Sequence, residues 1–300
     1  HISVGFFIFL IGSFVIGVAA TILQVVLNLY LTVCRIGKTT ALQRQMIGGT
    51  SNSIGMAIAP LVISYLIFHG TPLHDIVTKQ FIIPLIILIL IMLIITLLVG
   101  KTQMPSIDNV RQAPGEKFDK SVWSFRNLKL GVWGIFFYVG IEVAVGANVN
   151  MYASELGGSF ASNATHMAAL YWGLLLLGRF LGSFIKQVPS EKQLVIASIG
   201  AIVLLVLAML TANPWILTLI GFFHSIMWPA IFTLATDQLG KYTTKASGVL
   251  TMGVIGGGII PLLQGIFADV MGGNWLWTWL LVIAGEAYIL YYGLNGYKQH

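Results

Sequence analysis

Charged residues and cysteine are both scarce in this chain of 300 residues. Asp, Glu, Lys and Arg together make up 9% of it, whereas a soluble domain carries about 25%. The only cysteine, Cys34, excludes a disulfide within the chain, and we interpret it as a small buried hydrophobic residue. Hydrophobic residues instead reach 57%, with a mean hydropathy of +0.89. These proportions exclude a soluble domain and predict a protein that crosses a membrane several times.

Long apolar runs recur along the whole sequence. Each is long enough to cross a hydrocarbon core about 30 Å thick, and the runs lack the alternation over about 10 residues that is typical of transmembrane strands. The runs lie at 3–33, 46–68, 80–99, 129–152, 164–185, 193–211, 214–236, 247–270 and 276–295. The sequence therefore predicts an all-α integral membrane fold with nine transmembrane helices.

Basic residues gather on one side of the predicted membrane. Every lysine and arginine except Lys79 lies in or beside the connections that follow the first, third, fifth, seventh and ninth runs. By the positive-inside rule this side is cytoplasmic, so we expect the C-terminus in the cytoplasm and His1 outside. The net charge of +6 then reflects membrane topology, and we expect no nucleic-acid partner.

One long polar connection divides the runs into two groups. It covers 100–128 and begins "GKTQMPSIDNVRQAPGEKFDKSVWSFRN". We predict a cytoplasmic linker here, between three helices of an N-terminal bundle at 1–99 and a six-helix C-terminal bundle at 129–300. Transporters are often built from internal repeats. If the two bundles are equal, about three further helices would precede the first residue, which is not a methionine.

Glu142 is an acidic residue inside the apolar stretch "FFYVGIEVAVGANVNMY" (136–152). An acidic side chain at the centre of a bilayer costs about 2.5–3.5 kcal/mol on insertion scales, so it tends to face a partner or a cavity. Tyr138, Gly146 and Asn150 recur with Glu142 at every fourth position, which places all four on one side of a helix. We predict a polar stripe that contributes to a binding site, with Glu142 as the group that couples a cation.

Other predicted helices also carry hydrogen-bonding or aromatic side chains. Together with Tyr138, Glu142 and Asn150, the predicted substrate-binding set comprises Gln24, Asn28, Asn52, Tyr171, Trp172, His224 and Gln264. Neutral hydrogen-bonding groups and aromatic rings suit a neutral solute that is rich in hydroxyl groups. For Gln24, Asn28 and Asn52 taken singly, hydrogen bonds that only join one helix to another are an equal alternative.

Three further polar residues have structural interpretations. Asn148 would join two helices, and Glu286 would pair with a neighbour or contact water at the headgroups, with a functional role less favoured. Arg179 lies near the cytoplasmic end of its predicted helix, so we expect it to extend to the headgroups or to a loop. The run "MGVIGGGIIPLLQG" (252–265) predicts close helix packing. Because we find no His-Glu-x-x-His motif, paired aspartates or Ser-His-Asp set, we predict neither an enzyme nor a cofactor or metal site.

Six segments of the chain resemble one known family. They are "LQVVLNLY" (23–30), "RQMIGGTSNSIG" (44–55), "FFYVGIEV" (136–143), "YWGLLLLGRFLG" (171–182), "GFFHSIMWPAIFTLATDQLG" (221–240) and "SGVLTMGVIGGGIIPLLQGIFAD" (247–269). In this order they are similar to helices four, five, seven, eight, ten and eleven of the fucose:proton symporter family, within the major facilitator superfamily. The resemblance covers essentially the whole chain.

The resemblance implies a fold of two helical bundles, of which this chain would hold helices four to twelve. It also implies alternating-access uptake of a monosaccharide, driven by protons or, in some relatives, by sodium. Gln24 stands where glucose and galactose carriers have glutamine, and Asn52 matches an asparagine at the sugar site. Glu142 matches an acidic position that is usual in hexose carriers, whereas His224 stands where asparagine is common.

We therefore interpret the chain as a cation-coupled symporter for a monosaccharide such as glucose, galactose or fucose. We expect a monomer in the lipid bilayer of a bacterial inner membrane, with H⁺ favoured over Na⁺ as the coupling ion. Two alternatives stay open at this level. One is a membrane sensor or receptor that has the transporter fold but does not translocate sugar. The other is an integral-membrane enzyme that acts on a lipid-linked sugar.

Overall fold

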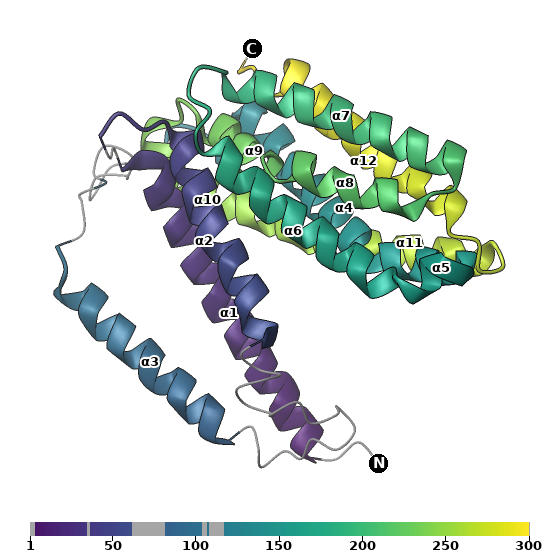
Figure 1. Ribbon diagram of the computed structural model, residues 1–300. Helices are drawn as coiled ribbons and strands as arrows, with labels where there is room; N and C mark the ends of the chain where they lie inside the picture. The colour runs from purple at the N-terminus through teal and green to yellow at the C-terminus, as the bar shows by residue number, and fades with distance from the viewer. Residues whose placement is uncertain (1–3, 35–36, 62–81, 104–106, 108–116, 300) are drawn as a thin grey trace. The chain divides into compact units, whose positions relative to one another are not determined.

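The computed structural model describes residues 4–34, 37–61, 82–103, 107 and 117–299 (Figure 1). The regular elements in these residues are all helical, which confirms the all-α prediction. The helices are α1 (Val4–Val33), α2 (Ala41–Leu61), α3 (Ile82–Lys101), α4 (Arg126–Leu156), α5 (Gly158–Ser162), α6 (Ala164–Gly182), α7 (Ser190–Thr211), α8 (Pro214–His224), α9 (Met227–Thr236), α10 (Thr243–Thr251), α11 (Gly256–Val270) and α12 (Trp279–Tyr291). Short helical turns flank several of them: η5 (Val122–Ser124), η6 (Gly240–Tyr242), η7 (Met252–Ile255), η8 (Leu276–Thr278) and η9 (Tyr292–Gly296).

Several of the described helices have the length and apolar character needed to cross a membrane. There are six such candidates: Gly5–Val33, Ile82–Lys101, Arg126–Leu156, Ser190–Thr211, Pro214–Thr236 and Gly240–Val270. The last two combine elements, α8 with α9 and η6 through α11. The predicted run at 46–68 is described only as far as Leu61, and Lys79 lies outside the described residues. The chain is a multi-pass membrane protein.

The chain forms two compact units. One contains His1–Thr50 together with Ile107–His300, and the other contains Ser51–Ser106. In the second unit α3 consists mainly of isoleucine and leucine, and none of its side chains is buried, as suits a helix that faces lipid. The predicted boundaries of the linker at 100–128 and of the two bundles stay predictions.

Helix α4 lies at the centre of the first unit. It packs against α6, α8, α9, α11 and α12, as Figure 1 shows. Its start is held by Asn127, whose side-chain amide donates to the carbonyl oxygens of Leu234 and Ala235 at the end of α9 and of Asp237 just beyond it. Carbonyl groups at the end of a helix have no partner within that helix, so Asn127 satisfies groups that would otherwise stay unpaired. The Tyr292 hydroxyl donates in turn to the Asn127 carbonyl oxygen.

Glycines allow α4 and α11 to cross at close range. The carbonyl group of Phe136 on α4 occupies the space that a side chain at Gly256 would need, and the Val132 carbonyl oxygen would lie 2.7 Å from a Cβ atom at Gly253. These contacts confirm the close packing predicted for 252–265. Gly258 faces open space instead. The tight crossing fixes the position of α4, which carries the predicted polar stripe.

The seventh predicted run is broken into two helices. Helix α8 ends at His224 and α9 begins at Met227, with Ser225 and Ile226 between them. Pro229 explains the break, because proline has no N–H to donate to the carbonyl group four residues earlier, which belongs to Ser225. The break therefore leaves a carbonyl oxygen available inside the bundle.

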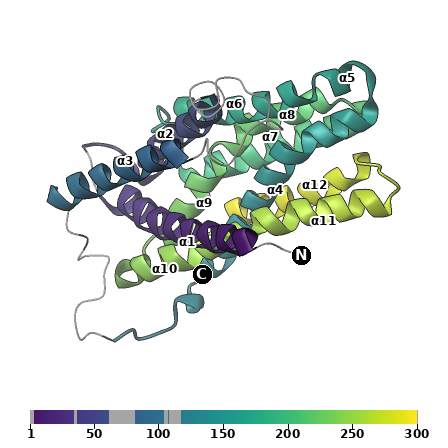
Figure 2. The same cartoon turned by 90° about the horizontal axis from the view of Figure 1, so that it is seen from below.

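Helices α1 and α2 are joined at their connection by Arg44. Its guanidinium group donates to the carbonyl oxygens of Leu31, Thr32 and Thr39, each at 2.7 Å. Helix α1 also contacts α10, where the Ser247 hydroxyl donates to a backbone oxygen of α1 (Figure 2). Cys34, just beyond α1, is partly exposed, so its interpretation as a buried residue was wrong.

Candidate functional site

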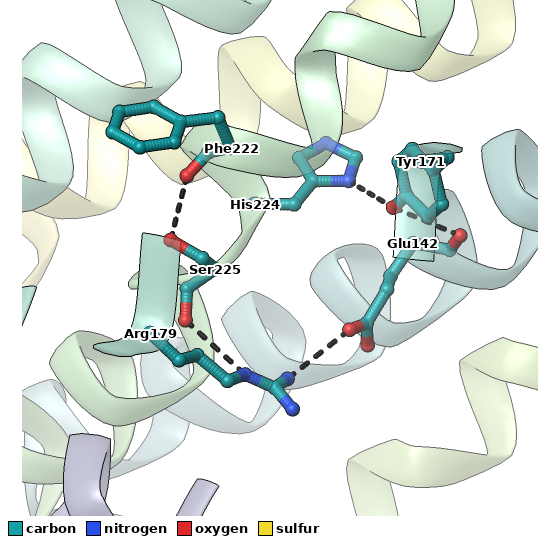
Figure 3. A network of polar contacts seen from close by, with 6 residues as sticks. All are labelled: Glu142, Tyr171, Arg179, Phe222, His224 and Ser225. Atoms are coloured by element: carbon teal, nitrogen blue, oxygen red, sulfur yellow. Dashed lines mark hydrogen bonds and ion pairs between the residues drawn. The ribbon is translucent and has the colours of Figure 1, made fainter. Parts of the chain in front are cut away.

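Five ionisable or hydroxyl-bearing side chains form a connected set inside the first unit, which we call the polar network. It comprises Glu142 on α4, Tyr171 and Arg179 on α6, His224 at the end of α8 and Glu286 on α12. Four of these residues appear in Figure 3, together with Phe222 and Ser225 at the break between α8 and α9. Membrane helices carry few ionisable residues, and such residues usually pair with one another.

Arg179 and Glu142 form an ion pair that joins α6 to α4. The Arg179 Nη2 atom lies 3.3 Å from Glu142 Oε1, and the side chains are 10% and 13% exposed (Figure 3). Arg179 Nε also donates to the Ser225 carbonyl oxygen at 3.4 Å, the oxygen that Pro229 leaves without a helical partner. The expectation that Arg179 reaches the headgroups or a loop was wrong. It faces inward because an acidic side chain and a backbone oxygen are both within its reach there.

Tyr171, His224 and Glu286 form a second chain of contacts, which is fully buried. The Tyr171 hydroxyl lies 2.6 Å from His224 Nδ1, and His224 Nε2 lies 2.6 Å from Glu286 Oε1. All three residues have 0% exposure. Of the two interpretations of Glu286, pairing with a neighbour is confirmed. Its other oxygen, Oε2, has no hydrogen-bond partner among the described residues.

The Tyr171 hydroxyl connects the two parts of the polar network. Besides its contact with His224, it lies 3.1 Å from the backbone carbonyl oxygen of Glu142 (Figure 3). Glycines bring α6 and α8 close enough for this arrangement. The Tyr171 carbonyl group occupies the space of a side chain at Gly221, and Ser225 and the Phe222 carbonyl group occupy that of Gly178.

The predicted stripe on α4 lies next to the polar network. Tyr138 is fully buried, and its ring meets the His224 ring edge to face with centroids 6.1 Å apart. The Tyr138 hydroxyl and the Asn150 Oδ1 atom are buried without a hydrogen-bond partner among the described residues. A Cβ atom at Gly146 would lie 2.5 Å from the Trp172 ring, so this glycine admits Trp172 against α4. The structure thus brings Tyr138, Glu142, Tyr171, Trp172 and His224 together.

Gln264 has a different set of partners. Its side-chain oxygen accepts from Asn148 Nδ2 at 3.0 Å, and its amide group donates to the Thr278 hydroxyl at 3.1 Å. These bonds join α4, α11 and η8, and they confirm that Asn148 connects helices. Gln264 is fully buried in this arrangement, and its predicted role in substrate binding stays a prediction.

The three predicted residues in the N-terminal part lie in different surroundings. Gln24 is exposed on α1, whereas Asn28 is 8% exposed. The backbone carbonyl oxygen of Asn28 accepts a hydrogen bond from Gln45 Nε2 at 2.8 Å. Asn52 is exposed and belongs to the second compact unit. A role of these side chains in sugar binding stays a prediction.

Sequence reasoning assigned no site role to Arg179 and favoured a structural role for Glu286. A usable signal was nevertheless present, because four predicted helices each contain an ionisable residue: Glu142, Arg179, His224 and Glu286. Each of these side chains alone would be energetically unfavourable in a bilayer, so pairing among them was the more stable arrangement. The sequence does not indicate which partner each residue chooses, since that depends on how the helices are rotated.

Comparisons with known proteins agree with this fold. The family model described as the Major Facilitator Superfamily matches residues 2–261. The chain is 34% identical to the glucose/galactose transporter of Brucella abortus biovar 1 (strain 9-941), over 97% of this chain and 72% of that protein. It is 27% identical to the L-fucose-proton symporter of Escherichia coli (strain K12), over 88% of this chain and 66% of that protein.

A solved structure supports the same fold assignment. It is the transporter FucP in the outward conformation, which has a TM-score of 0.77 at 23% identity and covers 91% of this chain and 72% of that chain. The chain belongs to the Major Facilitator Superfamily, in the group of the glucose/galactose transporters and fucose–proton symporters, and is therefore a transporter rather than an enzyme.

Proposed function

We propose that this chain belongs to a secondary active transporter that takes up a monosaccharide together with a cation. The similarity to glucose/galactose transporters supports glucose or galactose as the substrate, with fucose as a further candidate. We place it as a monomer in the inner membrane of a bacterium, with its C-terminus in the cytoplasm, because the basic residues lie on that side. We propose that the transporter uses no cofactor and that the coupling ion is H⁺, with Na⁺ as the alternative.

The observation that carries this proposal is the neighbourhood of α4. Tyr138 and Asn150 offer polar atoms that the described residues do not satisfy, and Trp172 lies partly buried on the same side of the helix. Sugar hydroxyl groups need such donors and acceptors, and the apolar face of a sugar ring can pack on an aromatic side chain. We assign Tyr138, Asn150, Tyr171 and Trp172 to substrate binding on this ground, with Gln24, Asn28, Asn52, His224 and Gln264 as further candidates.

Glu142 connects the proposed sugar stripe to the charged part of the polar network. It lies between Tyr138 and Asn150 along α4 and pairs with Arg179. A hydroxyl group of the sugar, or a proton on the carboxylate, would compete with Arg179 for the same oxygen atoms. Arg179 would then keep its contact with the Ser225 carbonyl oxygen at the break between α8 and α9. On this basis we propose that Glu142 takes part in cation coupling.

Accumulation of sugar in vesicles tests the proposal. The complete protein would be reconstituted in liposomes and supplied with radiolabelled D-glucose, D-galactose and L-fucose under an imposed proton or sodium gradient. A membrane potential is worth about 2.3 kcal/mol per charge per 100 mV, which supports roughly fifty-fold accumulation of a neutral sugar that enters with one cation. We expect accumulation of at least one sugar under the proton gradient. Binding without accumulation would instead indicate a sensor or receptor.

A further inference from the structure

The contact between His224 and Glu286 is the part of the polar network to which the proposed function assigns no role in cation coupling. Both side chains have 0% exposure, and the atoms His224 Nε2 and Glu286 Oε1 are 2.6 Å apart. The contact joins α12 to the break between α8 and α9. Glu142, in contrast, is partly exposed and has a permanent cation, Arg179, as its partner.

The charges around the pair determine how many protons it holds. Tyr138 and Glu142 on α4 and Tyr171 and Arg179 on α6 are the titratable or charged side chains that α4 and α6 direct to this region. Helix α9 and the part of α7 beyond its first turn contain no titratable residue, and α12 adds Tyr288 and Tyr291. Because Glu142 and Arg179 cancel, the pair is neutral with one added proton and carries a charge of −1 without it.

A buried charge without a partner is costly, whereas a neutral or internally paired group is tolerated. The pair is therefore stable with one proton and unstable without it, as long as the site is closed to water. Opening to one side of the membrane would hydrate the carboxylate and allow the proton to leave. These are the properties that a carrier of a coupling proton needs.

We propose that the His224–Glu286 pair binds the proton that enters together with the sugar, an inference that rests on the function proposed above. The proton is taken from water on the outside, held by the imidazole and carboxylate groups of the pair, and released to water on the inside. No other reactant is consumed. A sodium ion does not fit between two atoms 2.6 Å apart, and hard cations prefer several oxygen ligands to one oxygen and one imidazole nitrogen.

The Tyr171 hydroxyl would link the protonation state of the His224–Glu286 pair to a hydrogen bond on α4. When His224 is neutral with its proton on Nε2, Nδ1 is an acceptor and the Tyr171 hydroxyl donates to it. When both ring nitrogens carry protons, Nδ1 donates to the Tyr171 oxygen. The hydroxyl then donates to the backbone oxygen of Glu142, which lies 3.1 Å away. One proton thus changes a hydrogen bond at Glu142 without any movement of the heavier atoms.

Proton uptake upon sugar binding is the direct test. The complete wild-type protein in detergent and weak buffer would be mixed with D-glucose or D-galactose while a pH indicator records proton uptake. At a pH at which the free site is deprotonated, we expect about one proton per sugar and an affinity that falls about tenfold per pH unit. In Glu286→Gln, which is uncharged and of similar shape, we expect less than about a tenth of that proton uptake. Its sugar affinity should change less than about twofold over the same pH range.

Further variants identify the source of any change. Tyr171→Phe also removes a proposed sugar contact, so sugar binding should weaken, but about one proton per bound sugar should still be taken up without accumulation. Tyr292→Phe removes a buried hydroxyl outside the polar network and should behave like wild type. If Glu286→Gln does not fold, the double variant His224→Gln/Glu286→Gln replaces the pair by two amide groups, and the same losses are expected. Retained proton uptake in either variant would overturn the inference, as would its loss in Glu142→Gln alone. If the wild type accumulates no sugar, the proposed function fails instead.

Discussion

Pro229 cannot donate a hydrogen bond to the carbonyl oxygen of Ser225, and that oxygen accepts one from Arg179 Nε at 3.4 Å. The proline therefore acts at a distance of one helical turn. It interrupts the span at the level of the polar network and provides Arg179 with a backbone acceptor in addition to the Glu142 carboxylate. The position of a charged side chain thus depends on an amino acid that has no polar group in its own side chain.

Replacing Pro229 with alanine should close this break. The new N–H would donate to the Ser225 carbonyl oxygen, so Arg179 would have to share that acceptor. We expect an unfolding temperature equal to or above that of the wild type and an initial rate of sugar uptake several-fold lower. Pro214→Ala is the matched control, because Pro214 lies at the first position of α8, where a proline is tolerated. An uptake rate in Pro229→Ala equal to that of the control would contradict the role assigned to the break.

Removing one charge of the Arg179–Glu142 ion pair should lower the free energy of unfolding more than removing both charges. Glu142→Gln removes the carboxylate that pairs with Arg179. We expect the free energy of unfolding to fall by about 2 kcal/mol, below the roughly 3–5 kcal/mol of fully buried pairs because both side chains are slightly exposed. The double variant Glu142→Gln/Arg179→Gln should recover most of the lost free energy of unfolding. Unfolding in detergent mixtures measures this difference. Additive losses would show that the two side chains act independently.

Glu142→Gln should also separate accumulation from binding. The amide keeps the shape and the hydrogen bonds of the carboxyl group but cannot ionise. We expect a concentration ratio near unity under an imposed gradient, while sugar exchange across the membrane and the binding constant change much less. The three quantities would be measured in the same liposome preparation. A variant that accumulates sugar like the wild type would assign Glu142 a structural role.

A methyl group at position 146 should disturb the aromatic side chains of α6. The Cβ atom of Gly146→Ala would lie 2.5 Å from the Trp172 ring and 3.0 Å from the Tyr171 ring, so one of them must move. Overpacking of this kind costs about 1–3 kcal/mol, and we expect weaker sugar binding in a calorimetric titration. Gly173→Ala is the control on α6, since no atom lies within 4 Å of its added Cβ. Equal binding in both variants would remove Trp172 and Tyr171 from the proposed sugar site.

Reporter fusions test the proposed orientation. Because the basic residues gather on one side, a reporter after Asn127 and another after Gln299 should both indicate the cytoplasm. A reporter inserted at 153–163, around the end of α4, should indicate the outside. An external signal from the fusion after Asn127 would invalidate the assignment of spans on which the topology rests.

The fold could be predicted further than the site. Continuous apolar runs are sufficient to indicate membrane helices, since a bilayer leaves few alternatives for an exposed backbone. The polar stripe on α4 could also be predicted, because residues four positions apart lie on the same face of a helix independently of the tertiary structure. These two inferences depend on local periodicity alone.

Which ionisable side chains pair with one another could not be predicted in the same way. Arg179 is 37 residues from Glu142 and His224 is 62 residues from Glu286, so each contact depends on how two helices are rotated about their axes. The position of Arg179 near the end of its helix suggested the headgroups. Its rotation towards α4 and α8 follows from glycines at the crossing of α6 and α8, which sequence spacing alone does not relate to one another.

The pairing of buried charges also bears on how the chain enters the membrane during synthesis. Glu142 on α4 emerges from the ribosome before Arg179 on α6. Glu286 emerges after His224. Helix α4 is therefore synthesised before the counter-ion of Glu142, whereas α12 is synthesised after the partner of Glu286. Arg179 therefore enters the membrane after the acid with which it pairs, so the order of translation itself promotes correct assembly of α6 with α4.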